Sequence, residues 1–168
     1  MTYTANGADF AFEHTMENVG NTPALRVFPQ PILYAKTKQM PPEDVVLTNY
    51  IKSRADPTED PLGFTIGPKA KHVFTMRQNI SSEDIEKTRE SYTVNGVATN
   101  ILPVKFVGVV TYRSVVAKRQ HETSFYYEVM KLNDDDPPVL ICLSVLDQEI
   151  RAEKLALVKN ILFSPYMT

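Results

Sequence analysis

The sequence predicts a mainly β fold, an immunoglobulin-like β-sandwich with two to three accessory helices. Two observations lead to this prediction: a long hairpin-like stretch from Leu102 to Lys131, and 12 prolines against 6 glycines in 168 residues. Because proline interrupts helices and central strands alike, its abundance favours strands joined by loops. The length suits one domain over residues 1–168, since domains average roughly 150 residues.

The hairpin consists of two segments rich in Val, Tyr, Phe and Thr, on either side of the loop Ala117-Lys118-Arg119-Gln120. Antiparallel pairing across this loop places Tyr112 opposite Phe125 and Val110 opposite Tyr127. One face is then apolar, and we expect these four side chains to be buried. The other face is polar and is expected to meet water. That second face carries Thr111, Arg113, Glu122, Ser124, Tyr126 and Glu128.

The chain before the hairpin predicts strands, turns and two helices. Alternation from Ala8 to Glu17 predicts a half-buried strand, and a second strand is expected from Leu25 to Tyr34. The prolines within the second strand suit an edge strand or a strand that changes sheets, because proline lacks the N–H that a central ladder requires. Pro-Pro followed by two acidic residues predicts a short helix from Met40 to Arg54. A strand carrying Phe74 then leads into a helix that begins at Ser81 with a capping-box-like pair.

The chain after the hairpin predicts an acidic loop, a strand and a helix. The loop contains Asp134-Asp135-Asp136 and two prolines, and its composition is typical of a solvated turn. An apolar run from Val139 to Val145 predicts a strand. Apolar residues at helical spacing, including Ile150, Leu157 and Ile161, predict a C-terminal helix at about residues 147–163.

Two segments carry a resemblance to a known group of proteins. The run Asn18-Val19-Gly20-Asn21-Thr22-Pro23-Ala24-Leu25-Arg26-Val27 and the hairpin pieces Gly108 to Ser114 and His121 to Phe125 resemble the motifs N-x-G-x-T-P-A-x-x-V and G-x-x-x-Y-R-D…H-x-T-x-F. These motifs occur in a broad group of uncharacterised bacterial proteins, typically an N-terminal membrane hairpin followed by a small β-sandwich. The resemblance implies that fold and no particular activity. The chain differs from the group at Ser114 and Ala117, where Asp and Gly are usual, and it lacks the membrane hairpin.

Composition limits the partners and the compartment. A net charge of -2, from 18 basic and 20 acidic side chains, argues against a dedicated nucleic-acid binder. The single Cys142 cannot close an intrachain disulfide, so a reducing, cytoplasmic compartment is favoured. No signal peptide and no run of 18 apolar residues is present, so membrane association is expected only through a segment absent from this chain.

No motif in the sequence specifies a reaction. The three histidines His14, His72 and His121 are far apart and match no metal-ligand spacing, and His14 is expected to be a packed, hydrogen-bonded histidine of the core or its rim. Cys142 is expected to be buried and inert in its strand. The phosphate-loop, dinucleotide-binding and nucleophile-elbow motifs do not occur. We therefore expect no catalytic residue, metal ion or cofactor.

Charge placement suggests how the chain acts. The hairpin tip carries Lys118, Arg119 and His121, and the acidic loop lies at the opposite end of the hairpin, beyond the reach of direct neutralisation. We expect a non-catalytic binding or structural module, the soluble domain of a membrane-associated bacterial protein, that presents loops to a protein or a small anionic partner. Three alternatives stay open: a hydrolytic enzyme assembled from distant residues, head-to-tail self-association, and loops that are merely solvated.

Overall fold

The computed structural model describes residues 1–4, 6–42, 45–46, 48–49, 52, 63–94, 96–97, 99–116, 120–147 and 149–159. Within these residues the chain is mainly β. The elements in order are β1 (Thr2–Thr4), β2 (Gly7–Glu17), β3 (Ala24–Ala35), β4 (Phe64–Ile66), β5 (Lys71–Ser81), α2 (Ser82–Ser91), β6 (Ile101–Leu102), β7 (Val104–Ser114), β8 (Gln120–Leu132), β9 (Leu140–Ser144), the 3-10 turn Ala152–Lys154 and β10 (Leu155–Lys159).

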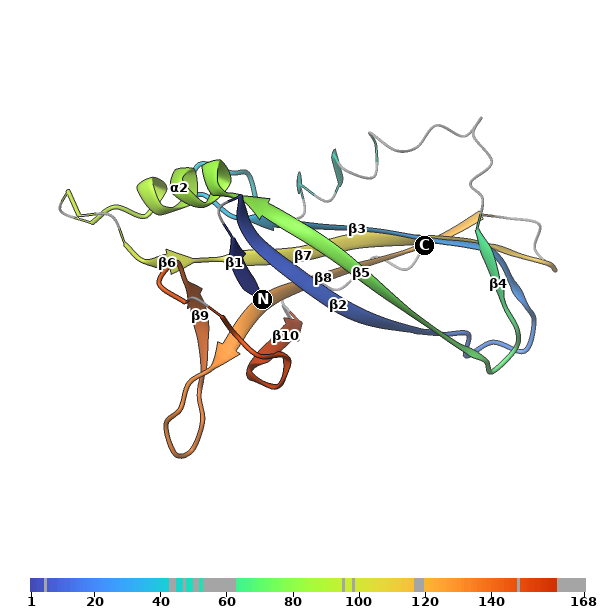
Figure 1. Cartoon of the computed structure of the whole chain (residues 1–168). Helices are drawn as coiled ribbons and strands as arrows, with labels where there is room; N and C mark the ends of the chain where they lie inside the picture. Colours follow the sequence, from blue (N-terminus) through green and yellow to red (C-terminus); the bar gives the residue numbers. More distant parts are fainter. Residues whose placement is uncertain are drawn as a thin grey trace.

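The strands form two antiparallel sheets. The smaller sheet has the order β1-β2-β5, and the larger sheet has the order β4-β3-β7-β8-β9-β6, with β10 paired to β8. Figure 1 shows the β2–β5 pair crossing the long strands of the larger sheet and separating from them toward β4. This arrangement is consistent with a β-sandwich, as expected from the sequence.

The apolar core lies between the two sheets at the end next to α2. Phe12 of β2 stacks on Phe106 of β7 with their ring centroids 4.7 Å apart. Removing each such side chain from water stabilises the fold by roughly 1.5–3 kcal/mol. The buried members of this core are Ala8, Phe10, Phe12, Ala35, Ile80, Ile85, Leu102, Val104, Phe106, Val129, Leu143 and Ile150.

Several predicted elements are confirmed. Strand β2 buries alternate residues as its pattern predicts, and β3 and β9 cover the expected segments. Helix α2 begins after the N-cap Ser81, whose Oγ accepts from the backbone N–H of Asp84 at 3.1 Å and donates to its carboxylate at 2.7 Å. No helix in the described part of the chain combines the length and the apolar character that a membrane span needs.

The predicted hairpin exists, but its predicted register is wrong by four residues. Strand β7 ends at Ser114 and β8 begins at Gln120, so Tyr112 lies opposite His121 and Gly108 lies opposite Phe125. A Cβ added at Gly108 would lie 2.5 Å from Cζ of Phe125, so the glycine leaves the space that this ring fills. Because the shift is an even number of residues, each side chain keeps its predicted face.

The division of the hairpin into a buried and a wet face is only partly correct. Val110, Tyr112, Phe125 and Tyr127 are half-buried rather than buried. On the face predicted to be wet, Tyr126 is buried.

The same outer face carries a largely buried ion pair. The Lys105 ammonium lies 2.9 Å from the Glu128 carboxylate, with 8% and 26% of the two side chains exposed. Lys105 also lies over the ring of Tyr126, 5.8 Å from its centroid. The outer face at this end of the sheet is therefore a second buried layer, which the strand alternation alone did not indicate.

The predicted C-terminal helix at about residues 147–163 is wrong over the described residues. Leu155 to Lys159 form β10, which pairs with β8 from Tyr127 to Lys131. A short apolar run suits either a helix or a strand, and here the open edge of β8 provides backbone partners. The helix predicted from Met40 to Arg54 is confirmed where the structure describes it. Residues 45–46, 48–49 and 52 are helical, and the backbone N–H of Val46 donates to the carbonyl of Pro42 at 3.1 Å; residues 43–44, 47, 50–51 and 53–54 lie outside the described ranges.

Candidate functional site

A cleft of about 570 Å³ opens where the two sheets separate. Phe106 stacks on β2, so the other even-numbered residues of β7 point toward the same sheet. Strand β2 ends at Glu17, and from there the loop of residues 18–23 covers β7 and β8 in its place. The cleft is lined by Met16, Glu17, Asn18, Val19, Gly20, Thr22, Pro23, Ala24, Val27, Ile66, Val110, Tyr112, Ser114, His121 and Thr123.

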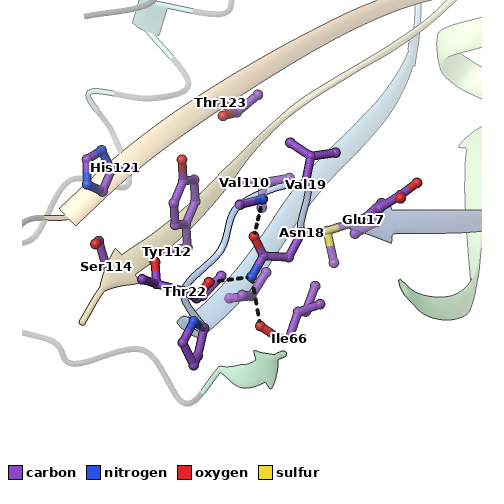
Figure 2. Close-up of a pocket in the computed structure, with 15 residues that line it drawn as sticks. Glu17, Asn18, Val19, Thr22, Ile66, Val110, Tyr112, Ser114, His121 and Thr123 are labelled. Atoms are coloured by element: carbon purple, nitrogen blue, oxygen red, sulfur yellow. Dashed lines mark hydrogen bonds between the residues drawn. The ribbon is translucent and has the colours of Figure 1, made fainter. Parts of the chain in front are cut away.

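One wall of the cleft is held in place by Asn18. Its Nδ2 donates to the carbonyl oxygens of Thr22, at 2.8 Å, and Ile66, at 3.1 Å. Its Oδ1 accepts from the backbone N–H of Gly20 at 3.0 Å (Figure 2). The backbone of Asn18 also pairs with Lys69 and Ala70. This single side chain therefore closes the loop on itself and joins it to β4.

The opposite wall changes from apolar to polar along β7 and β8. Val110 lies opposite Thr123, and one step further out Tyr112 lies opposite His121. The Tyr112 and His121 rings stack with their centroids 5.2 Å apart. Figure 2 shows this pair next to Ser114 at one side of the cleft. The inner part is therefore apolar, and the mouth carries an imidazole and hydroxyl groups.

A lysine outside the cleft lining contacts the loop wall. The Lys69 ammonium donates to the backbone carbonyl of Val19, which lines the cleft. The carboxylate of Glu17 lies 3.3 Å from the ammonium of Lys71, which offsets its charge. In Figure 2, Glu17 lies on the side of the cleft away from His121. The mouth near His121 therefore lacks a nearby acid among the cleft residues.

The site predicted from the sequence is only partly described. His121 lines the cleft, whereas Lys118 and Arg119 lie outside the described residues. The loop of residues 18–23 was not predicted to belong to the site. The two segments that carry the resemblance to the bacterial group, around Asn18 and around His121, line the same cleft, but neither motif indicates that they meet.

The acidic loop lies at the other end of β8, as predicted, but its charges are not all available to a partner. The Asp134 carboxylate accepts from the ammonium of Lys154 at 2.7 Å. This hydrogen bond lowers the pKa of Asp134. Asp135 accepts from the side-chain amide of Asn133. The loop is thus tied to the segment before β10, which weakens the case for head-to-tail association through it.

The two other groups considered for chemistry have different surroundings. His14 is half-buried and stacks on Phe74 and Phe106, with centroids 5.1 and 4.9 Å away. It is packed as predicted, but its Nε2 finds no hydrogen-bond partner in the described part of the protein, and desolvation lowers its pKa. Cys142 is exposed, which corrects the prediction that it is buried, although partial desolvation still raises the pKa of its thiol. Across the described residues no three His, Cys, Asp or Glu side chains are grouped to hold a metal ion.

Comparisons of the chain with models of protein families, with curated proteins and with solved structures each found no match.

Proposed function

We propose that this protein is a non-catalytic binding module, and that its binding site is the cleft at the His121 end of the sandwich. The observation that carries the proposal is the convergence of two distant segments, the loop around Asn18 and the ends of β7 and β8, on one cleft of about 570 Å³. Clefts of roughly 300–1,000 Å³ with an apolar lining and a few polar groups are typical of small-ligand sites.

The charge of the mouth supports a small anionic partner. His121 lies on the strand wall, and the Lys69 ammonium, outside the lining, contacts the loop wall through the Val19 carbonyl, so each wall carries or adjoins a basic group that favours an anion. Glu17, the acid of the cleft, is paired with Lys71. Lys118 and Arg119 precede β8 in the sequence and are expected to strengthen this preference.

The alternative function, a hydrolytic enzyme, draws on the presence of Ser114, His121 and Glu17 around the same cleft. A catalytic triad requires the base between the nucleophile and the acid, each within hydrogen-bond reach. Glu17 lies across the cleft from His121 in Figure 2 and is paired with a lysine. Binding therefore fits the geometry better than catalysis.

The connectivity supports the finer proposal that the sandwich is immunoglobulin-like. The sheet β1-β2-β5 corresponds to strands A, B and E of that fold, and the run β4-β3-β7-β8 corresponds to C′, C, F and G. Helix α2 then occupies the connection from E to F. The resemblance to membrane-associated bacterial proteins supports attachment to a membrane through a segment absent from this chain.

The test is an NMR titration of the ¹⁵N-labelled protein with butyrate, benzoate and inorganic phosphate. We expect saturable shifts at the amides of Val19, Val110 and Thr123 with at least one anion. Binding should weaken with added salt and on replacing Lys118 and Arg119 together with Glu. Absence of saturable shifts in the cleft with all three anions would reject the proposal, as would binding that His121→Glu leaves unchanged.

A further inference from the structure

Building on the proposed function, we infer that the cleft binds a medium-chain alkyl carboxylate, with the alkyl chain inside the cleft and the carboxylate at the mouth. The inference rests on how the lining changes with depth, which the proposed anion site alone does not require.

Apart from Thr123, which lies opposite Val110, the inner part of the cleft is lined mainly by apolar side chains. Val27 and Ile66 are buried and line its inner surface, and half-buried Met16 and Val110 adjoin them. The polar groups of Asn18 that face this region are bonded to the loop backbone and to Ile66. A ligand that offered only charge would leave this surface uncovered, whereas an alkyl chain removes it from water.

The mouth is suited to one negative charge. His121 lies on its strand wall, the Lys69 ammonium donates from outside the lining to the Val19 carbonyl of its loop wall, and the hydroxyl groups of Ser114 and Tyr112 lie near the imidazole. A carboxylate uses two acceptor oxygens, which an imidazole and neighbouring hydroxyl groups can satisfy. The polar groups are therefore at the mouth and the apolar groups at the inner end, as a single-chain amphiphile requires.

The effect of alkyl-chain length on affinity distinguishes this inference from simple anion binding. Each methylene group taken out of water raises affinity roughly fourfold. Octanoate has four more methylene groups than butyrate, so burying even two of them gives a complex that is about sixteenfold tighter. Octanol has the chain without the charge and is expected to bind more weakly than octanoate.

The experiment measures dissociation constants for butyrate, octanoate and octanol by NMR titration of the full chain. Val110→Thr places a hydroxyl group in the apolar part at nearly constant shape and should reduce the octanoate-to-butyrate preference at least threefold. Val73→Thr, the same change at an exposed position of β5, should leave it unchanged. His121→Gln should weaken octanoate and leave octanol unaffected.

The outcomes separate the two proposals. Equal affinity for butyrate and octanoate in the cleft would overturn the alkyl-carboxylate inference and leave the anion site standing. Absence of cleft shifts with every ligand would overturn both. If octanoate binds more tightly than butyrate but Val110→Thr does not change this preference, the alkyl chain lies outside the proposed part of the cleft. That result would also overturn the inference.

Discussion

Replacing Asn18 with Ala should destabilise the protein far more than replacing its neighbour Asn21. The Asn18 side chain makes three hydrogen bonds to backbone groups of Gly20, Thr22 and Ile66. Each such bond contributes roughly 0.5–1.5 kcal/mol. Since two of the three are exposed to solvent, we take the lower part of this range and expect a loss of about 2 kcal/mol in the free energy of unfolding.

Urea denaturation followed by circular dichroism measures this loss, and thermal melts should show a decrease of about 4–8 °C in Tm. Asn21→Ala is the matched control, with the same change in the same exposed loop. Asn18→Asp keeps the acceptor for the Gly20 N–H but places a second oxygen against the carbonyl oxygens of Thr22 and Ile66. It should therefore lower the free energy of unfolding at least as much as Asn18→Ala. If Asn18→Ala falls within about 0.5 kcal/mol of Asn21→Ala, the three bonds do not hold the loop and the reasoning fails.

Three further predictions follow from the core and the second buried layer. Burial lowers the pKa of His14 below its ordinary 6.5, so near this pH the unfolded chain binds more protons than the folded protein. Stability should therefore fall as pH decreases through 6.5. Urea denaturation at pH 7 and pH 5 should show a smaller loss of unfolding free energy for His14→Phe than for the wild type. Lys105→Met leaves the Glu128 carboxylate without its lysine partner and should lower the free energy of unfolding by about 2–3 kcal/mol. The loss is smaller than for a fully buried pair because 26% of the Glu128 side chain is exposed. Adding Glu128→Leu should restore most of this stability in the same assay. Gly108→Ala brings a methyl group to 2.5 Å from Cζ of Phe125 and to 2.7 Å from backbone atoms of Gln30 and Pro31, so a loss of about 1–3 kcal/mol is expected. Unchanged stability would contradict this close packing of β7 against β3 and β8.

Much of the candidate site depends on contacts that leave little trace in sequence. His121 could be proposed from its place beside two basic residues at a strand end. Strand β2 ends at Glu17, whereas β7 continues to Ser114. The loop around Asn18 therefore lies over the inner face of β7 where β2 no longer does. Strand lengths relative to one another are a property of the assembled sheets, so the cleft itself could not be predicted.

Features that depend on local periodicity and local hydrogen bonds could be predicted without the structure. The alternation in β2, the cap at Ser81 and the faces of the hairpin are of this kind, because they require only neighbours a few residues away. The hairpin register, with Phe125 opposite Gly108, and the strand at Leu155 to Lys159 in place of a helix depend on long-range contacts. Both outcomes depend on partners that are distant in sequence. An aromatic side chain packs only where the facing strand leaves space, and a short apolar run forms a strand where an open sheet edge offers backbone partners.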